Sequence, residues 1–316
     1  MKRFLQFGLG VSLSGVACSS VYAQVEGPVS TQALVNVDHR SAPPASASAV
    51  TVAVNGHKEA LTDWQPVAPA NAQVALLIDD GLRMTVGREL DNLRIFLDKL
   101  PPGVEVLVGF MQNGRVVSEQ GFTADHAQAA AALRLPTGLP GTSASPYLCL
   151  SEFVKHWPGA GASSGAGESL AVEHKARFVL MISNGVDPYN GSTSLMNQDS
   201  PYVAASAKDA QRAGVAVYAL YFADAGIRGG SANTSGQNYL SQVAEQTGGL
   251  SLWQGMGNPI SMEPFLDEFR RAVSETYVAT FPATAGRAAR DLVQVKFSAP
   301  KTKLRAADEV RPGNKE

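Results

Sequence analysis

Polar side chains that could bind a metal ion or take part in catalysis follow two strongly apolar stretches of this sequence. Residues 74–78 are all apolar and lead directly into Asp79, and residues 178–182 are all apolar and lead into Asn184 and Asp187. Carboxylate and amide oxygens are the ligands that hard cations such as Mg²⁺ prefer. If the two stretches are neighbouring parallel strands, their polar ends meet at one edge of a sheet.

A hydroxyl-rich loop lies between these stretches in the sequence. Residues 141–145 read Gly-Thr-Ser-Ala-Ser and precede a helical segment, so Thr142 and Ser143 are candidate ligands or candidate helix caps. A hydrolase that uses Asp79 with this loop is an alternative interpretation. The loop lacks the Gly-x-Ser-x-Gly order of a nucleophile elbow, which argues against that alternative.

The elements that must position these residues alternate between strand and helix patterns. Short apolar runs, typical of strands covered on both faces, alternate with segments whose apolar residues recur every three or four positions. Parallel strands need helical crossovers, and these pack on both faces of the sheet. The prediction is an α/β fold with a doubly wound, mainly parallel sheet and helices on both faces.

The domain organisation follows from where this alternation begins and ends. Residues 70–275 form the predicted α/β domain, residues 49–69 a β-hairpin with a turn at residues 55–56, and residues 276–316 C-terminal strands and a tail. Residues 24–48 contain two adjacent prolines and many small polar residues, which predicts a disordered leader. The hairpin and the late strands are expected to pack together as a small β appendage.

These segments together resemble the von Willebrand factor A (vWA) domain family, and in particular bacterial secreted vWA-related proteins. The likeness covers residues 50–313 and rests on the strand into Asp79, the loop around Thr142, the strand into Asn184 and the terminal strand at residues 277–281. It implies the strand order 3-2-1-4-5-6 and a binding module. It also implies a Mg²⁺ site built from an Asp-x-Ser-x-Ser motif, a Thr and a distant Asp.

Carried onto this sequence, the family's metal site is incomplete. Asp79 and Thr142 match family ligands, whereas Gly81 and Arg83 replace the two serines and Asn184 replaces the last aspartate. Asp187 lies nearby as a substitute ligand outside the family position. We therefore expect a degenerate site and no cofactor, with Mg²⁺ binding as the alternative. In the degenerate site, the guanidinium of Arg83 would pair with Asp79 in place of a metal.

Composition narrows the class of partner and the compartment. The chain has 316 residues, 45% apolar and 17% charged, with a net charge of −2, which disfavours nucleic-acid binding.

Residues 1–23 have a basic start, an apolar stretch and a small-residue end, so they are predicted to be a signal peptide removed before Gln24. Lipidation at Cys18 is the alternative. No later run is long enough to span a membrane, so export to the periplasm or beyond is expected.

The leading functional hypothesis is an exported, non-enzymatic vWA-like module that binds a protein of unknown identity through the carboxyl edge of the sheet. Arg83, Ser143 and Tyr189 are the candidate partner-binding residues, because they belong to loops at that edge. Besides the hydrolase interpretation, an inert structural part of an envelope assembly is an alternative.

Overall fold

The structure is a computed structural model of the chain. It describes residues 27–314, except residues 39, 42, 44–45, 140, 160–174, 188, 190–199, 224–228, 256 and 285–290. The predicted signal peptide and Cys18 lie outside the described residues. Among the described residues, no helix is both long and apolar enough to cross a bilayer.

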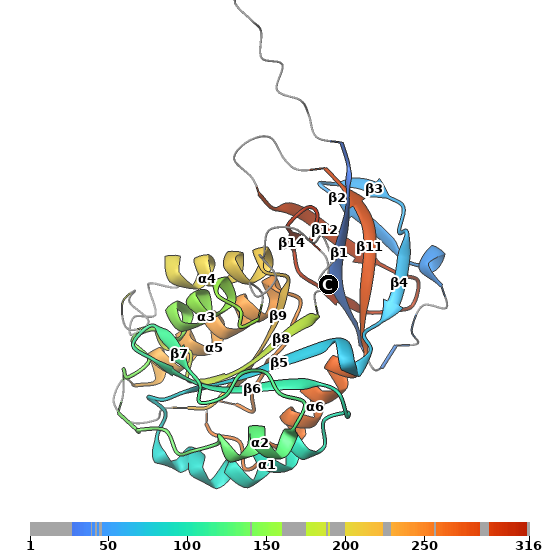
Figure 1. The fold of residues 1–316 in the computed structure, drawn as a ribbon. Coiled ribbons are helices and arrows are strands. Elements are labelled where there is room, and N and C mark those ends of the chain that lie inside the picture. Colours follow the sequence, from blue (N-terminus) through green and yellow to red (C-terminus); the bar gives the residue numbers. More distant parts are fainter. Residues whose placement is uncertain are drawn as a thin grey trace, which may run out of the picture.

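A six-stranded sheet forms the centre of the larger part of the molecule (Figure 1). Neighbouring strands follow the order β10, β9, β8, β5, β6, β7, and all pairs are parallel except the antiparallel pair β6–β7. Their bounds are Ser251–Leu252, Val215–Tyr221, Ala176–Ser183, Ala72–Asp79, Glu105–Gln112 and Arg115–Val117. The predicted doubly wound, mainly parallel sheet is confirmed.

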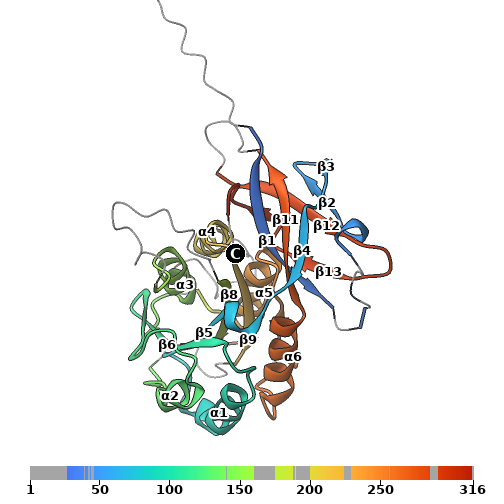
Figure 2. The same ribbon diagram turned by 45° about the vertical axis from the view of Figure 1, so that its right-hand side comes forward.

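Helices cover both faces of this sheet (Figure 2). The helices α1, α2 and α6 pack on one face, with bounds Leu90–Asp98, His126–Ala131 and Glu263–Ser274. The helices α3, α4 and α5 pack on the other, with bounds Pro146–Lys155, Pro201–Arg212 and Gly229–Gln246. Because both faces are covered, β8 and β9 are buried along almost their whole length, which explains their unbroken apolar runs. The free Cys149 of α3 is also buried.

Two four-stranded sheets form a second part, built from both ends of the described chain (Figure 1). One has the order β13, β1, β11, β4, with bounds Leu304–Ala306, Val29–Val37, Thr276–Ala283 and Asp63–Pro66. The other has the order β14, β12, β2, β3, with bounds Glu309–Val310, Val293–Ser298, Thr51–Val54 and His57–Glu59. We call these two packed sheets the β-sandwich.

The β-sandwich confirms one prediction and corrects another. The hairpin strand β2 pairs with the late strand β12, as expected for an appendage formed by the two segments. The prediction of a disordered leader over residues 24–48 is wrong for Val29–Val37, which form β1 and pair with β11 over eight positions. Inward-facing Ala33, Val35 and Val37 are buried, so this strand contributes to both sandwich cores.

Candidate functional site

Asp79 is the last residue of β5 and lies at the point where the strand order reverses. Strands β5 and β8 are parallel neighbours. Asp79 at the end of β5 and Asn184 directly after β8 therefore lie at the same edge of the sheet, as predicted. The Asp79 side chain is only 2% exposed. It accepts hydrogen bonds from the Gly81 amide at 2.9 Å and from the Ser183 hydroxyl at 2.8 Å. The Ser143 side chain lies close enough to this carboxylate to lower its pKa.

These contacts set the electrostatics of Asp79. Burial raises the pKa of its carboxyl above the ordinary value, because a charge in a poorly solvated site is costly. The hydrogen bonds from Gly81 and Ser183, together with the nearby Ser143, lower the pKa, and the neighbouring Asp80 raises it slightly further. Both carboxylate oxygens therefore already have donors from the protein itself.

Asp80, and not Asp79, has an arginine partner, and that arginine is Arg134. Its buried carboxylate forms an ion pair with Arg134 at 2.7 Å, and it also accepts from the Thr137 amide and the Gln112 side chain. The Arg134 guanidinium lies 3.7 Å from the centroid of the Phe110 ring. The prediction that Arg83 pairs with Asp79 is wrong, because all the contacts shown for the Asp79 carboxylate come from other groups. The arginine that enters this region comes from the loop after α2.

Thr142 and Asn184 form local turns instead of converging on Asp79. The Thr142 hydroxyl donates to the Leu139 carbonyl at 2.6 Å, in the loop before α3. The Asn184 side-chain oxygen accepts from the Val186 amide at 2.9 Å. The structure therefore brings Asp79 and Ser143 together and leaves Thr142 and Asn184 in turn-stabilising roles.

Asp187 and Tyr189 lie in the loop that follows β8. Asp187 is buried and accepts from the Ser200 hydroxyl at 2.7 Å and from the Tyr189 amide at 3.1 Å. It thereby connects the loop to the first turn of α4. The Tyr189 ring is exposed and meets Tyr202 of α4 edge to face, with centroids 6.4 Å apart.

The residues at this edge do not fit a Mg²⁺ ion. A Cβ added at Gly81 would lie 3.2 Å from Asp79 Oδ1 and 3.2 Å from the Leu139 carbonyl oxygen, so the loop fills the place of the family's first serine. The oxygens of Asp79, Thr142 and Asn184 are each engaged in hydrogen bonds within the protein. No group of three or more metal-binding His, Cys, Asp or Glu side chains occurs in the described part of the chain.

The same geometry is unsuited to a serine nucleophile. Ser143 is buried, and the neighbouring Asp79 carboxylate is closed off from solvent, so a substrate has no access to the hydroxyl. Of the histidines within the described ranges, His126 bonds to the Val104 carbonyl and His156 to Glu152, away from Ser143. A hydrolase that used Ser143 would need this edge to open.

Exposed apolar side chains at this edge were missed by the sequence reasoning. Ten large apolar side chains are exposed in the described chain, and seven of them lie in the loops and first turns around the carboxyl ends of the strands: Met84, Leu135, Leu139, Tyr189, Tyr202, Trp253 and Ile260. We call these seven residues the apolar rim. In the sequence, these side chains could have been found as single apolar residues within segments predicted to be loops.

The fold of the central sheet can now be assigned. Counted in chain order, β5 to β10 are strands 1 to 6, and their spatial order is 3-2-1-4-5-6 with strand 3 antiparallel. This is the order implied by the vWA resemblance, and the domain has a vWA-like fold. The assignment rests on the topology together with the helices on both faces.

Comparisons with known proteins give distant structural neighbours only. No protein-family profile and no curated protein matches the sequence. An aerotolerance-related membrane protein from Bacteroides fragilis is 11% identical, with a TM-score of 0.43, covering 64% of this chain and 98% of its own. A von Willebrand factor type A protein from Catenulispora acidiphila is 9% identical, with a TM-score of 0.38, covering 92% of this chain and 75% of its own.

Proposed function

We propose that this protein is a non-enzymatic binding module that holds a protein partner on the apolar rim without a metal ion. The observation that carries the proposal is the concentration of exposed apolar side chains at the carboxyl edge of the sheet. Exposed apolar groups gathered on one face are typical of protein interaction sites. The rim also surrounds the switch point, where open α/β sheets bind their ligands.

Contacts within the protein hold together the loops that carry Met84, Leu139 and Ile260. Met84 packs on the loop before α3, since a Cβ at Gly138 would lie 3.2 Å from Met84 Cγ. The segment that carries Ile260 is tied to the start of α1, because the Met262 amide donates to Glu89 and Asn92 donates to Ser261. Ile260 is 96% exposed and Leu139 is 67% exposed. A surface fixed in this way loses little conformational entropy on binding.

The buried residues at this edge of the sheet support the apolar rim but do not contact the partner in this proposal. The Asp80–Arg134 pair positions the loop that carries Leu135 and Leu139, through the bonds from Thr137 to Asp80. Asp79 orders the turn after β5. In this proposal the carboxylates therefore shape the rim, and the partner contacts apolar side chains.

The test uses purified mature protein as bait in an exported-protein fraction, with chemical cross-linking and quantitative mass spectrometry. Three baits are compared: wild type, the rim variant Met84→Ser with Leu139→Ser, and the control Ile95→Ser, which removes an exposed apolar side chain from the outer face of α1. A specific partner should be captured by wild type and by the control, equally in EDTA and in Mg²⁺, and lost with the rim variant. Equal capture by the rim variant, or loss of capture in EDTA, contradicts the proposal.

Export is a separate part of the proposal and has its own test. The support is the basic, apolar and small-residue pattern of residues 1–23. Mass spectrometry of the mature protein should find Gln24 as the first residue. A diacylglyceryl group on Cys18 would show lipoprotein processing, and an intact N-terminus would contradict export by this route.

A further inference from the structure

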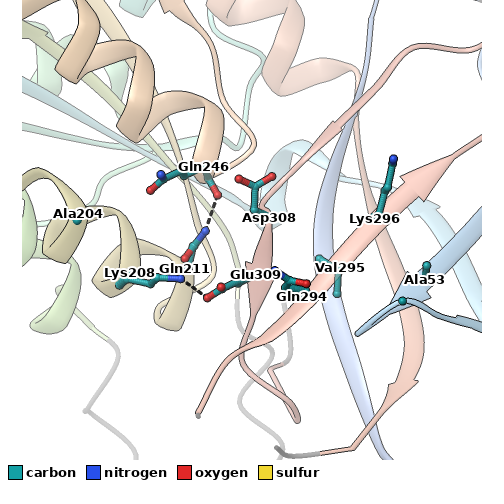
Figure 3. Close-up of a pocket in the computed structure, with 11 residues that line it drawn as sticks. Ala53, Ala204, Lys208, Gln211, Gln246, Gln294, Val295, Lys296, Asp308 and Glu309 are labelled. Carbon is teal, nitrogen blue, oxygen red and sulfur yellow. Dashed lines mark hydrogen bonds and ion pairs between the residues drawn. The ribbon is translucent and has the colours of Figure 1, made fainter. Parts of the chain in front are cut away.

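A cavity of about 610 Å³ lies between the vWA-like domain and the β-sandwich (Figure 3). Lys208 and Gln211 of α4 and Gln246 at the end of α5 form one wall. Lys296 of β12 and Asp308, which precedes β14, come from the β-sandwich. We call this cavity the junction pocket. Its volume lies within the range that small-molecule sites occupy.

The walls of the junction pocket are fixed by contacts between the two parts of the molecule. Lys208 forms an ion pair with Glu309. The Asp308 amide donates to the Gln246 carbonyl at 3.0 Å, and the Gln211 side-chain amide donates to the same carbonyl at 2.7 Å. Contacts within the protein therefore hold the polar groups of the cavity walls in place.

Asp308 offers an acceptor that the protein leaves unused. No hydrogen-bond donor to its carboxylate occurs among the described residues, whereas the charge of Lys208 is taken by Glu309. Burial and the neighbouring Glu309 raise the pKa of Asp308, and Lys208 offsets only part of this effect. A cation placed beside Asp308 would stabilise its ionised form.

Gln211 also lines this cavity, but its side-chain oxygen is closed off from the cavity space. Its side chain is only 2% exposed, and the side-chain oxygen is buried without a donor in the part of the chain that is described. The side-chain amide of Gln211 instead fixes the wall through its bond to the Gln246 carbonyl. The Asp308 carboxylate is therefore the acceptor that favours a ligand with an ammonium group.

Lys296 gives the pocket a free positive charge at its other side. Its side chain is exposed, and no carboxylate lies within ion-pair distance of its ammonium group in the described ranges. Figure 3 shows Lys296 and Lys208 on opposite sides of Asp308. The pocket thus combines an unpaired carboxylate with an unpaired ammonium group.

We infer that the junction pocket binds a small zwitterion of the amino-acid or short-peptide class. The ammonium group of the ligand bonds to Asp308, and its carboxylate pairs with Lys296. Hydrogen bonds between charged groups are stronger than neutral ones, so the two ends of the ligand provide both affinity and orientation. Loss of either end should therefore weaken binding strongly.

The first experiment uses isothermal titration calorimetry of the full mature chain with diglycine, and with glycine to separate the peptide from the amino acid. N-acetyl-diglycine lacks the ammonium group, and diglycine amide lacks the carboxylate. Diglycine or glycine should bind. For whichever of the two is the ligand, blocking either end should weaken affinity by about tenfold or more, the effect of one charged hydrogen bond.

The second experiment locates the site with matched variants. Asp308→Asn and Lys296→Gln should each weaken binding of the parent ligand by about tenfold, and Ala204→Trp should abolish it by filling the cavity. The controls Asp98→Asn and Lys301→Gln change exposed residues outside the pocket and should leave affinity unchanged. Absence of binding by both parents, equal binding of the blocked peptides, or binding unaffected by all three pocket variants would overturn the inference.

Discussion

Two carboxylates, Asp79 of the vWA-like domain and Asp308 of the β-sandwich, differ in how the protein uses them. Asp79, at the carboxyl edge of the sheet, has hydrogen-bond donors on both oxygens and is closed off from solvent. Asp308, in the junction pocket, is exposed and only partly desolvated, and it has no donor to its carboxylate among the described residues. Both have a raised pKa because of burial. The comparison teaches that burial alone does not mark a ligand site. The presence or absence of internal partners decides whether a carboxylate is structural or available.

The largest effect is expected at Asp80, the most heavily bonded carboxylate at the edge of the sheet. Asp80→Ala removes the partner of Arg134 and of the Thr137 amide at once. We expect a loss of about 3 kcal/mol in the free energy of unfolding, since breaking a buried ion pair leaves polar groups unsatisfied. Urea denaturation measures it. The control Asp91→Ala, which breaks the exposed pair with Arg94, should cost less than about 0.5 kcal/mol. A similar small loss for Asp80→Ala would show that this pair is dispensable.

Removing the Asp79 side chain and neutralising its charge should have different effects on the free energy of unfolding. Asp79→Ala leaves the Gly81 amide and the Ser183 hydroxyl without their acceptor and should cost about 2 kcal/mol of unfolding free energy. Asp79→Asn keeps an acceptor oxygen and should retain most of the stability. If the two variants are equally unstable in urea denaturation, the hydrogen bonds of Asp79 are not what stabilises the turn.

The raised pKa of Asp79 also predicts a pH dependence with a definite sign. In the unfolded chain the carboxyl ionises near its ordinary value of 3.8, and in the folded protein it ionises at a higher pH. Between those two values the unfolded state loses its proton first, so the wild type loses stability as the pH rises. The Asp79→Asn variant lacks this loss, so its stability relative to wild type should increase with pH across that interval and then stay constant. A difference that is flat or falls with pH would mean that the folded pKa is not raised.

A smaller effect of opposite sign is expected in the junction pocket. Asp308→Asn removes a charge with no hydrogen-bond donor and should raise the unfolding free energy by a few tenths of a kcal/mol, about the scale of partly exposed charges. Glu309→Gln removes the partner of Lys208 and should lower it. Differential scanning calorimetry of the two variants in parallel checks both signs. A destabilised Asp308→Asn protein would place Asp308 in the same structural class as Asp79.

The vWA-like sheet was predictable because its signals are local. The apolar runs of β5, β8 and β9 indicate, within a few residues, that both faces of each strand are buried. The order of the strands follows from the rules for crossover connections. The strand β1 was missed because its partner residues in β11 lie 240 to 254 positions away. Its alternation is also irregular, since the polar residues Thr31 and Asn36 are buried. Local composition therefore favoured a leader where long-range pairing makes a strand.

The candidate site was predictable only in part, for the same physical reason. The position of Asp79 at the switch point follows from the strand that precedes it. The partner of Asp80 could not be deduced, since Arg134 lies in a loop with no periodic pattern and reaches the carboxylate only in the folded chain. The junction pocket combines α4, α5 and the C-terminal strands, so no stretch of sequence contains it.

The central claim is that Asp79 serves the fold and that the carboxyl edge works without a metal ion. Titration calorimetry of Mg²⁺ into the wild-type protein, with the melting temperature recorded in EDTA and in millimolar Mg²⁺, tests it most directly. We predict no saturable heat and an unchanged melting temperature, because a ligand that does not bind the native state cannot stabilise it. Stoichiometric Mg²⁺ binding that raises the melting temperature and is abolished by Asp79→Asn would contradict the account.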